Sequence, residues 1–170
     1  MKTVREPTRM DILVLLVTRR AWVLPILSAI STLGGASVRE LREELGVRTP
    51  IVRRGLWWLS KYGIIEKTGD KYVITDDYRE AVDTVLHEYC HVGNQYVYRI
   101  GATYIYVHVK KTRVHAYTAP EKYIADLMRL EEEGGGVFSA LDYSMTRGLP
   151  IKLARRVVRI RELLRVCRGY

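Results

Sequence analysis

The 170-residue sequence has few cysteines and no long apolar segment. Its two cysteines, Cys90 and Cys167, are too few for a disulfide framework, and the simplest expectation is a pair of reduced thiols. The longest apolar runs, residues 12–17 and 21–30, are shorter than the roughly 20 residues that a membrane span needs. The N-terminus shows no small-residue cleavage site of a signal peptide. We therefore expect a globular cytoplasmic protein with no membrane partner.

Acidic residues are scarce at both ends of the chain. Residues 1–75 carry 13 basic and 7 acidic groups, residues 76–146 carry 7 and 11, and residues 147–170 carry 8 and 1. The net charge of +9 is thus concentrated at the two ends, around an acidic middle. This distribution favours a polyanionic partner for at least one end. A solvated helix face is the simpler explanation of the C-terminal run.

Three helices are expected before residue 46. The first covers residues 9–18, and the second covers residues 21–33 and ends at a glycine pair. Ser37 is followed three residues later by Glu40, which is the spacing of a capping box, and it predicts the start of the third helix.

A fourth helix and a hairpin are predicted by the segment GVRTPIVRRGLWWLSKYGIIEK, residues 46–67, and by the residues that follow it. Thr49 and Pro50 predict the helix start, as N-cap and first helical residue. An apolar stripe with spacings of four and three follows, and Gly63 ends the helix. Two strands, which begin at Ile64-Ile65 and at Lys71, then flank a tight turn at Gly69-Asp70. Two helices joined by a short turn and followed by a hairpin predict a helix-turn-helix with a wing.

This register resembles that of winged-helix transcription regulators, in which the outer face of the second helix enters the major groove of double-stranded DNA. The residues that the apolar stripe leaves pointing outward are Arg48, Thr49, Ile51, Arg53, Arg54, Trp57 and Lys61. The resemblance implies that Arg53 and Arg54 contact guanine edges or phosphates, and that Lys67 and Lys71 at the wing contact phosphates. It also implies a homodimer. The alternative is a protein-interaction module, which the pair Trp57-Trp58 favours.

Residues 76–170 predict a small mixed α/β domain, for partner binding or dimerisation, that ends in a basic helix. The expected helices cover about 76–91, 120–132, 137–146 and 151–167, and the expected strands lie within 95–100, 103–110 and 113–118. We therefore expect an α+β fold with a winged helix-turn-helix over residues 1–75, followed by this second domain.

The pentapeptide His87-Glu88-x-x-His91 has the spacing of a zinc-peptidase helix, with two histidines on one face and a glutamate that could activate water. Nothing in the spacing selects a third ligand, and a predicted winged helix precedes it where a peptidase has a sheet. A metal site that adds His108 and His115, which face each other across a predicted hairpin, is a second hypothesis. We expect neither: no catalytic residue, metal or cofactor is predicted.

Residues 99–128, RIGATYIYVHVKKTRVHAYTAPEKYIADLM, resemble the C-terminal domain of antitoxins from AbiE-type abortive-infection systems. A strand pair leads into a helix whose motif runs from Ala119-Pro120-Glu121-Lys122 to Asp126, although the segment before Arg99 is shorter than in that family. The resemblance implies an antitoxin that represses its own operon and counteracts a nucleotidyltransferase-like toxin. Its implied partners are double-stranded DNA and a cognate toxin.

Overall fold

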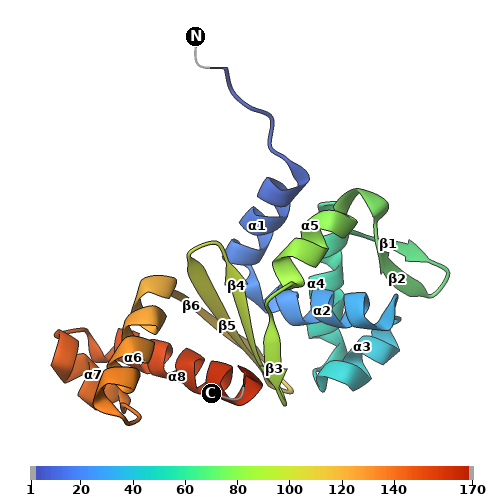
Figure 1. Ribbon diagram of the computed structural model, residues 1–170. Helices are drawn as coiled ribbons and strands as arrows, with labels where there is room; N and C mark the ends of the chain where they lie inside the picture. The colour runs from blue at the N-terminus through green and yellow to red at the C-terminus, as the bar shows by residue number, and fades with distance from the viewer. Residues whose placement is uncertain (1–2, 169–170) are drawn as a thin grey trace. The chain divides into compact units, whose positions relative to one another are not determined.

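The computed structural model describes residues 3–168 and shows a mixed α+β protein (Figure 1), which confirms this part of the expected fold class. The chain forms two compact units. The first runs from the N-terminus to His87 and also includes Val107–His115. The second consists of Glu88–Tyr106 and the chain from Ala116 onward.

The first unit contains five α-helices and a two-stranded sheet. Its elements are α1 (Arg9–Arg19), the 3-10 helix η1 (Ala21–Val23), α2 (Leu24–Leu33), α3 (Val38–Leu45), α4 (Thr49–Lys61), β1 (Ile65–Thr68), β2 (Lys71–Ile74) and α5 (Asp76–Leu86). Because α5 packs against α1, the division expected between residues 75 and 76 falls inside this unit. Within residues 3–168 no single helix is long and apolar enough to cross a membrane. Only α1 and η1–α2 together, bent by 105°, meet that requirement.

Local capping signals set the starts of α1 and α3, as the sequence predicts. The Thr8 hydroxyl accepts a hydrogen bond from the Asp11 amide, and the Asp11 carboxylate accepts one from the Thr8 amide. Ser37 and Glu40 form the same reciprocal pair at α3. α2 ends at Gly34, which has a left-handed conformation (φ 67°). Glycine adopts this conformation without strain because it has no side chain.

α4 approaches α2 closely because Gly55 has no side chain. A Cβ atom at this position would lie 2.2 Å from Cδ1 of Ile26 on α2. Val52, Leu56 and Leu59 of α4 are buried in the same core, as the apolar stripe predicts. The remaining side of α4 is therefore free to face away from this core.

The β1–β2 hairpin forms around the turn predicted at Gly69-Asp70. Its strands are antiparallel, with Thr68 opposite Lys71. A further bridge between Ala36 and Tyr72 joins β2 to the segment that precedes α3. The hairpin is thus tied by backbone hydrogen bonds to the start of α3.

The second unit combines most of a four-stranded sheet with three helices. Its elements are β3 (Cys90–Val92), β4 (Gln95–Ile100), β5 (Thr103–Val109), β6 (Val114–Pro120), α6 (Glu121–Gly134), α7 (Ala140–Arg147) and α8 (Ile151–Arg168). The strand order is β3-β4-β5-β6, and the hairpin end of β5–β6 belongs to the first unit. α8 packs against α6, α7, β3 and β4, and its buried Val157, Ile160 and Leu164 join one core with Val97 and Ile124.

The helix predicted over residues 76–91 is wrong in its last part. α5 ends at Leu86, and the chain turns there into β3. The His91 backbone pairs with Tyr96 on β4, and the Tyr89 ring stacks on Tyr98 with 5.5 Å between centroids. Pairing with β4 thus outweighs the helical continuation that the local pattern favours, and Gly93, at φ 59°, makes the turn between the two strands.

The expectation of two reduced thiols is also wrong, because Cys90 and Cys167 form a disulfide bond. Their Cα atoms lie 6.1 Å apart, which is within the ordinary range for a disulfide. Seventy-seven residues separate the two cysteines in the sequence, so their proximity is produced by the packing of α8 on β3. The bond fastens the start of β3 to the last turn of α8.

Candidate nucleic-acid interface

The side of α4 that faces away from the core is rich in arginine. Arg53 and Arg54 are exposed on the helix, and Arg48 is exposed at its N-cap. Arg48 takes the N-cap position that the sequence predicts for Thr49, which becomes the first helical residue and is half-buried. Ile51 is half-buried as well. The exposed face of α4 therefore includes less of Thr49 and Ile51 than the sequence predicts.

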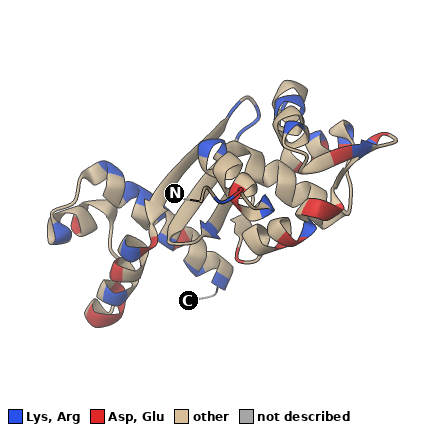
Figure 2. Cartoon of the chain, turned by 90° about the horizontal axis from the view of Figure 1, so that it is seen from above, with Lys and Arg blue, Asp and Glu red and all other residues tan. Residues whose placement is uncertain are grey.

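The positive charge of these arginines has no acidic counterpart among the described residues. Throughout residues 3–168, no carboxylate forms an ion pair with Arg48, Arg53 or Arg54. Figure 2 shows the distribution of Lys and Arg against Asp and Glu over the chain. A group of exposed arginines on one helix can bind phosphate oxygens or base edges, because each guanidinium offers several donors in a fixed plane.

An aromatic group lies beside the arginines on α4. The Trp57 side chain is 54% exposed and meets the Trp58 ring edge-on, with 4.9 Å between centroids. The Arg20 guanidinium lies 3.4 Å from the Trp58 centroid, and the Lys61 ammonium lies 5.0 and 5.1 Å from the Trp57 and Trp58 centroids. Trp58 is therefore engaged within the protein, whereas Trp57 offers surface to a partner.

The two lysines of the β1–β2 hairpin have different surroundings. The Lys71 ammonium lies 3.6 Å from a carboxylate oxygen of Glu40. The pKa of Glu40 is lowered, first by its hydrogen bonds with Ser37 and then by Lys71. Lys67 lies 5.9 Å from the Tyr72 ring centroid, and no ion pair of Lys67 occurs among the described residues. Lys67 thus retains more of its charge for a partner than Lys71 does.

The β5–β6 hairpin adds basic residues to the predicted interface of α4 and the β1–β2 hairpin. Its tip carries Lys110, Lys111 and Arg113, and the Arg48 amide donates a hydrogen bond of 2.9 Å to the Lys111 carbonyl. The cluster of basic residues is visible in the sequence. Its position beside α4 is not, because more than 60 residues separate Arg48 from Lys111 along the chain.

The four histidines do not form either of the two metal-ligand sets that were alternative hypotheses from the sequence. His87 lies at the C-terminal end of α5 and His91 on β3, so they do not share a helical face as the peptidase hypothesis requires. His108 is half-buried on β5, and His115 is exposed on β6. In the described part of the chain, no group of three or more His, Cys, Asp or Glu side chains is placed to hold a metal ion.

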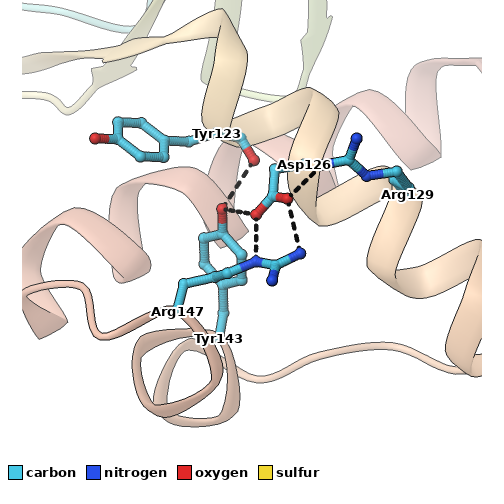
Figure 3. A network of polar contacts seen from close by, with 5 residues as sticks. All are labelled: Tyr123, Asp126, Arg129, Tyr143 and Arg147. Carbon is cyan, nitrogen blue, oxygen red and sulfur yellow. Dashed lines mark hydrogen bonds and ion pairs between the residues drawn. The ribbon is translucent and has the colours of Figure 1, made fainter.

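The motif behind the antitoxin resemblance forms ion pairs within the second unit. Figure 3 shows Asp126 of α6 at the centre of one network. Its carboxylate accepts hydrogen bonds from the Tyr143 hydroxyl (2.9 Å), from two nitrogens of Arg147 (2.9 and 3.0 Å) and from Arg129 (2.9 Å). The bonds from Arg147 are the main reason why the pKa of Asp126 is lowered, whereas burial raises the pKa of Tyr143.

A second charged group joins α6 to α8. One carboxylate oxygen of Glu131 accepts from Arg161 at 2.9 Å, and the other accepts from Arg165 at 2.8 Å. The Glu131 and Arg161 side chains are each only 10% exposed, so both charges depend on this pairing. Two of the arginines of α8, Arg161 and Arg165, are therefore neutralised by Glu131 inside the second unit. Arg155 and Arg159, by contrast, are exposed.

Comparison with known proteins supplies no relative: no protein-family model, curated protein or solved structure matches the chain. The resemblances to winged-helix regulators and to AbiE-type antitoxins stay predictions from the sequence.

Proposed function

We propose that the protein is a sequence-specific DNA-binding transcription regulator. In this proposal the first unit is a winged helix-turn-helix, with α3 and α4 as the helix pair, α4 as the recognition helix and β1–β2 as the wing. The observation that carries the proposal is the outer face of α4, where Arg48, Arg53 and Arg54 are exposed and lack acidic partners in residues 3–168. Such a face suits the major groove.

In this proposal, different residues of the interface would contact the bases and the phosphates. Arg53 and Lys61 would face base edges or phosphates along α4, and Trp57 would contribute apolar contact, for example with thymine methyl groups. Lys67 at the wing would contact phosphate and so position the protein without reading sequence. A homodimer would place two such faces on a palindromic site.

The binding test is fluorescence anisotropy with DNA from the gene's own upstream region, compared with scrambled DNA at several salt concentrations. We expect a preference of at least about 10³ over scrambled DNA and a steep salt dependence. The double variant Arg53→Ala/Arg54→Ala should lose this preference. Arg79→Ala is the matched control, because Arg79 is an exposed arginine on α5 that is paired with Asp76 at 3.1 Å. Equal affinity of the double variant and the wild type would remove α4 from the interface.

We also propose, from the resemblance of residues 99–128, that the regulator acts as an antitoxin that represses its own operon. Its second unit would then bind a nucleotidyltransferase-like toxin. Co-expression with the product of the adjacent gene tests this part, and a stable stoichiometric complex is the expected result. Free migration of both proteins on size exclusion would remove the antitoxin role and leave the DNA-binding proposal intact.

The second candidate is a protein-interaction module centred on Trp57. The exposed indole, 54% accessible on a helix surface, is the observation that favours it. Large exposed aromatic side chains often anchor protein interfaces. Weak and equal binding to both DNAs would favour this candidate, and Trp57→Ala would then be the variant to compare in a search for a protein partner.

A further inference from the structure

The tip of the β5–β6 hairpin is joined to the N-cap of α4 by one main-chain hydrogen bond, within the first unit. The Arg48 amide donates to the Lys111 carbonyl at 2.9 Å. The Lys110 amide donates to the Arg113 carbonyl, also at 2.9 Å, and closes the turn. Because both bonds use backbone atoms, a change of the Arg113 side chain leaves them in place.

A cavity of about 260 Å³ lies between this tip and α4. It is lined by Trp22, Ile51, Arg54, Thr112, Arg113 and Val114. The lining thus contains one arginine from α4, one arginine and one threonine from the hairpin, and no acidic residue. Neither Arg54 nor Arg113 forms an ion pair with any of residues 3–168. Two guanidinium groups on one cavity repel each other until an anion lies between them.

We propose that this cavity binds a phosphate group of the DNA backbone, held between Arg54 and Arg113. Guanidinium groups bind phosphate oxygens through paired N–H donors, and two of them can hold one phosphate from both sides. The hairpin becomes a second phosphate-contacting element beside α4, with the exposed Lys111 at its tip. This inference rests on the proposed function, because it requires DNA to lie along α4.

The proposal separates the roles of two neighbouring arginines. Arg54 lines the cavity together with Ile51, three residues earlier on the same side of α4. Arg53 lies about 100° further around the helix and is not part of the lining. Arg54 therefore contacts phosphate and contributes affinity without sequence preference, whereas Arg53 remains available for base edges.

The test measures the salt dependence of DNA binding for the full-length variants Arg113→Ala and Arg54→Ala. Loss of one phosphate contact lowers the slope of log K against log salt by about 0.9. Each variant should show this decrease, with affinity lost equally on upstream and scrambled DNA. Arg113→Lys keeps the charge and should keep the slope, and the control Arg79→Ala should match the wild type. An unchanged slope in Arg113→Ala overturns the proposal.

Two further measurements separate the possible failures. Thermal unfolding by circular dichroism verifies that each variant is folded, and Arg113→Gln replaces Arg113→Ala if the latter is not. Inorganic phosphate alone is titrated while tryptophan fluorescence is followed, with Trp22→Phe as the control for the indole in the cavity. We expect no saturable change. A saturable change at millimolar phosphate that Arg113→Ala abolishes, together with an unchanged salt slope for DNA in that variant, would assign the cavity to a free anion and overturn the DNA source. If the wild type does not bind DNA, the proposed function is wrong. If it binds DNA but Arg113→Ala leaves the slope of log K against log salt unchanged, only the proposed phosphate site is wrong.

Discussion

Reduction of the Cys90–Cys167 disulfide should destabilise the second unit by an amount that the structure allows us to calculate. The bond closes a loop of 77 residues, and the chain-entropy relation gives about 4.5 kcal/mol for a loop of this length at 25 °C. Measured values usually fall below this figure, because a real unfolded chain retains some structure. We therefore expect reduction to lower the free energy of unfolding of the second unit by about 3 kcal/mol.

Urea unfolding with and without reductant measures this effect. With a denaturant slope of about 2 kcal/mol/M, a loss of 3 kcal/mol moves the midpoint down by about 1.5 M urea. The three tryptophans, Trp22, Trp57 and Trp58, all belong to the first unit, so their emission reports that unit alone. Near-UV circular dichroism of the tyrosines, most of which belong to the second unit, should show the shift.

The single variants Cys90→Ala and Cys167→Ala serve as the controls. Each should unfold at nearly the urea midpoint of the reduced wild type, and reductant should have no further effect on either. Coincident tyrosine transitions for the oxidised and reduced wild type would refute the reasoning. So would two titratable thiols in the unfolded protein before any reductant is added, because the crosslink would then be absent.

Two further predictions concern the charged networks of the second unit. The pKa of Asp126 lies below its ordinary value of 3.8, mainly through Arg147, so its contribution to stability is present above that pH and is lost as the pH falls through the lowered pKa. Asp126→Asn should therefore cost about 2 kcal/mol at neutral pH and progressively less as the pH falls below 3.8, which a series of urea unfolding curves from neutral to acidic pH would measure. Arg161→Ala should cost about 3 kcal/mol in the same assay, because, among residues 3–168, it leaves the buried Glu131 carboxylate paired with Arg165 alone. A double variant, Glu131→Leu/Arg161→Met, that was as unstable as Arg161→Ala would contradict this explanation.

Local signals in the sequence predict the elements of the first unit well. The capping box at Ser37 fixes α3 through hydrogen bonds within four residues, and the Gly69-Asp70 turn fixes the register of the hairpin beside it. The stripe that contains Val52 and Leu59 identifies the buried side of α4, and with it the exposed Arg53. Each of these features depends on neighbouring residues, which is why one sequence suffices.

Two features that the sequence did not reveal, the Cys90–Cys167 disulfide and the position of Lys111 beside α4, involve residues that are distant in the sequence. His87 to His91 fits a helical pattern locally, but β3 pairs with β4 and Cys90 bonds to Cys167, and these contacts decide the conformation. The β3–β4 hairpin has one local signal, the Gly93-Asn94 turn between its two strands. This turn signal predicts the observed conformation better than the helical spacing of His87 and His91 does. The position of Lys111 against α4 has no local signal, because it depends on the whole path of the sheet.

The arginines of α4 and of the β5–β6 hairpin tip differ from the paired arginines of α7 and α8, although Arg155 and Arg159 of α8 are also exposed and form no ion pair among residues 3–168. In the second unit, carboxylates pair with Arg147, Arg161 and Arg165, and these pairs join α6 to α7 and to α8. On α4 and the hairpin tip, no such pairing occurs for Arg54 or Arg113 in residues 3–168, although they line one cavity. Exposed ion pairs contribute little to stability, so folding alone does not require acids there, but grouped like charges raise the electrostatic energy of the free protein. An anion that binds between these side chains lowers that energy, and a polyanion that spans the whole face would lower it at several arginines at once.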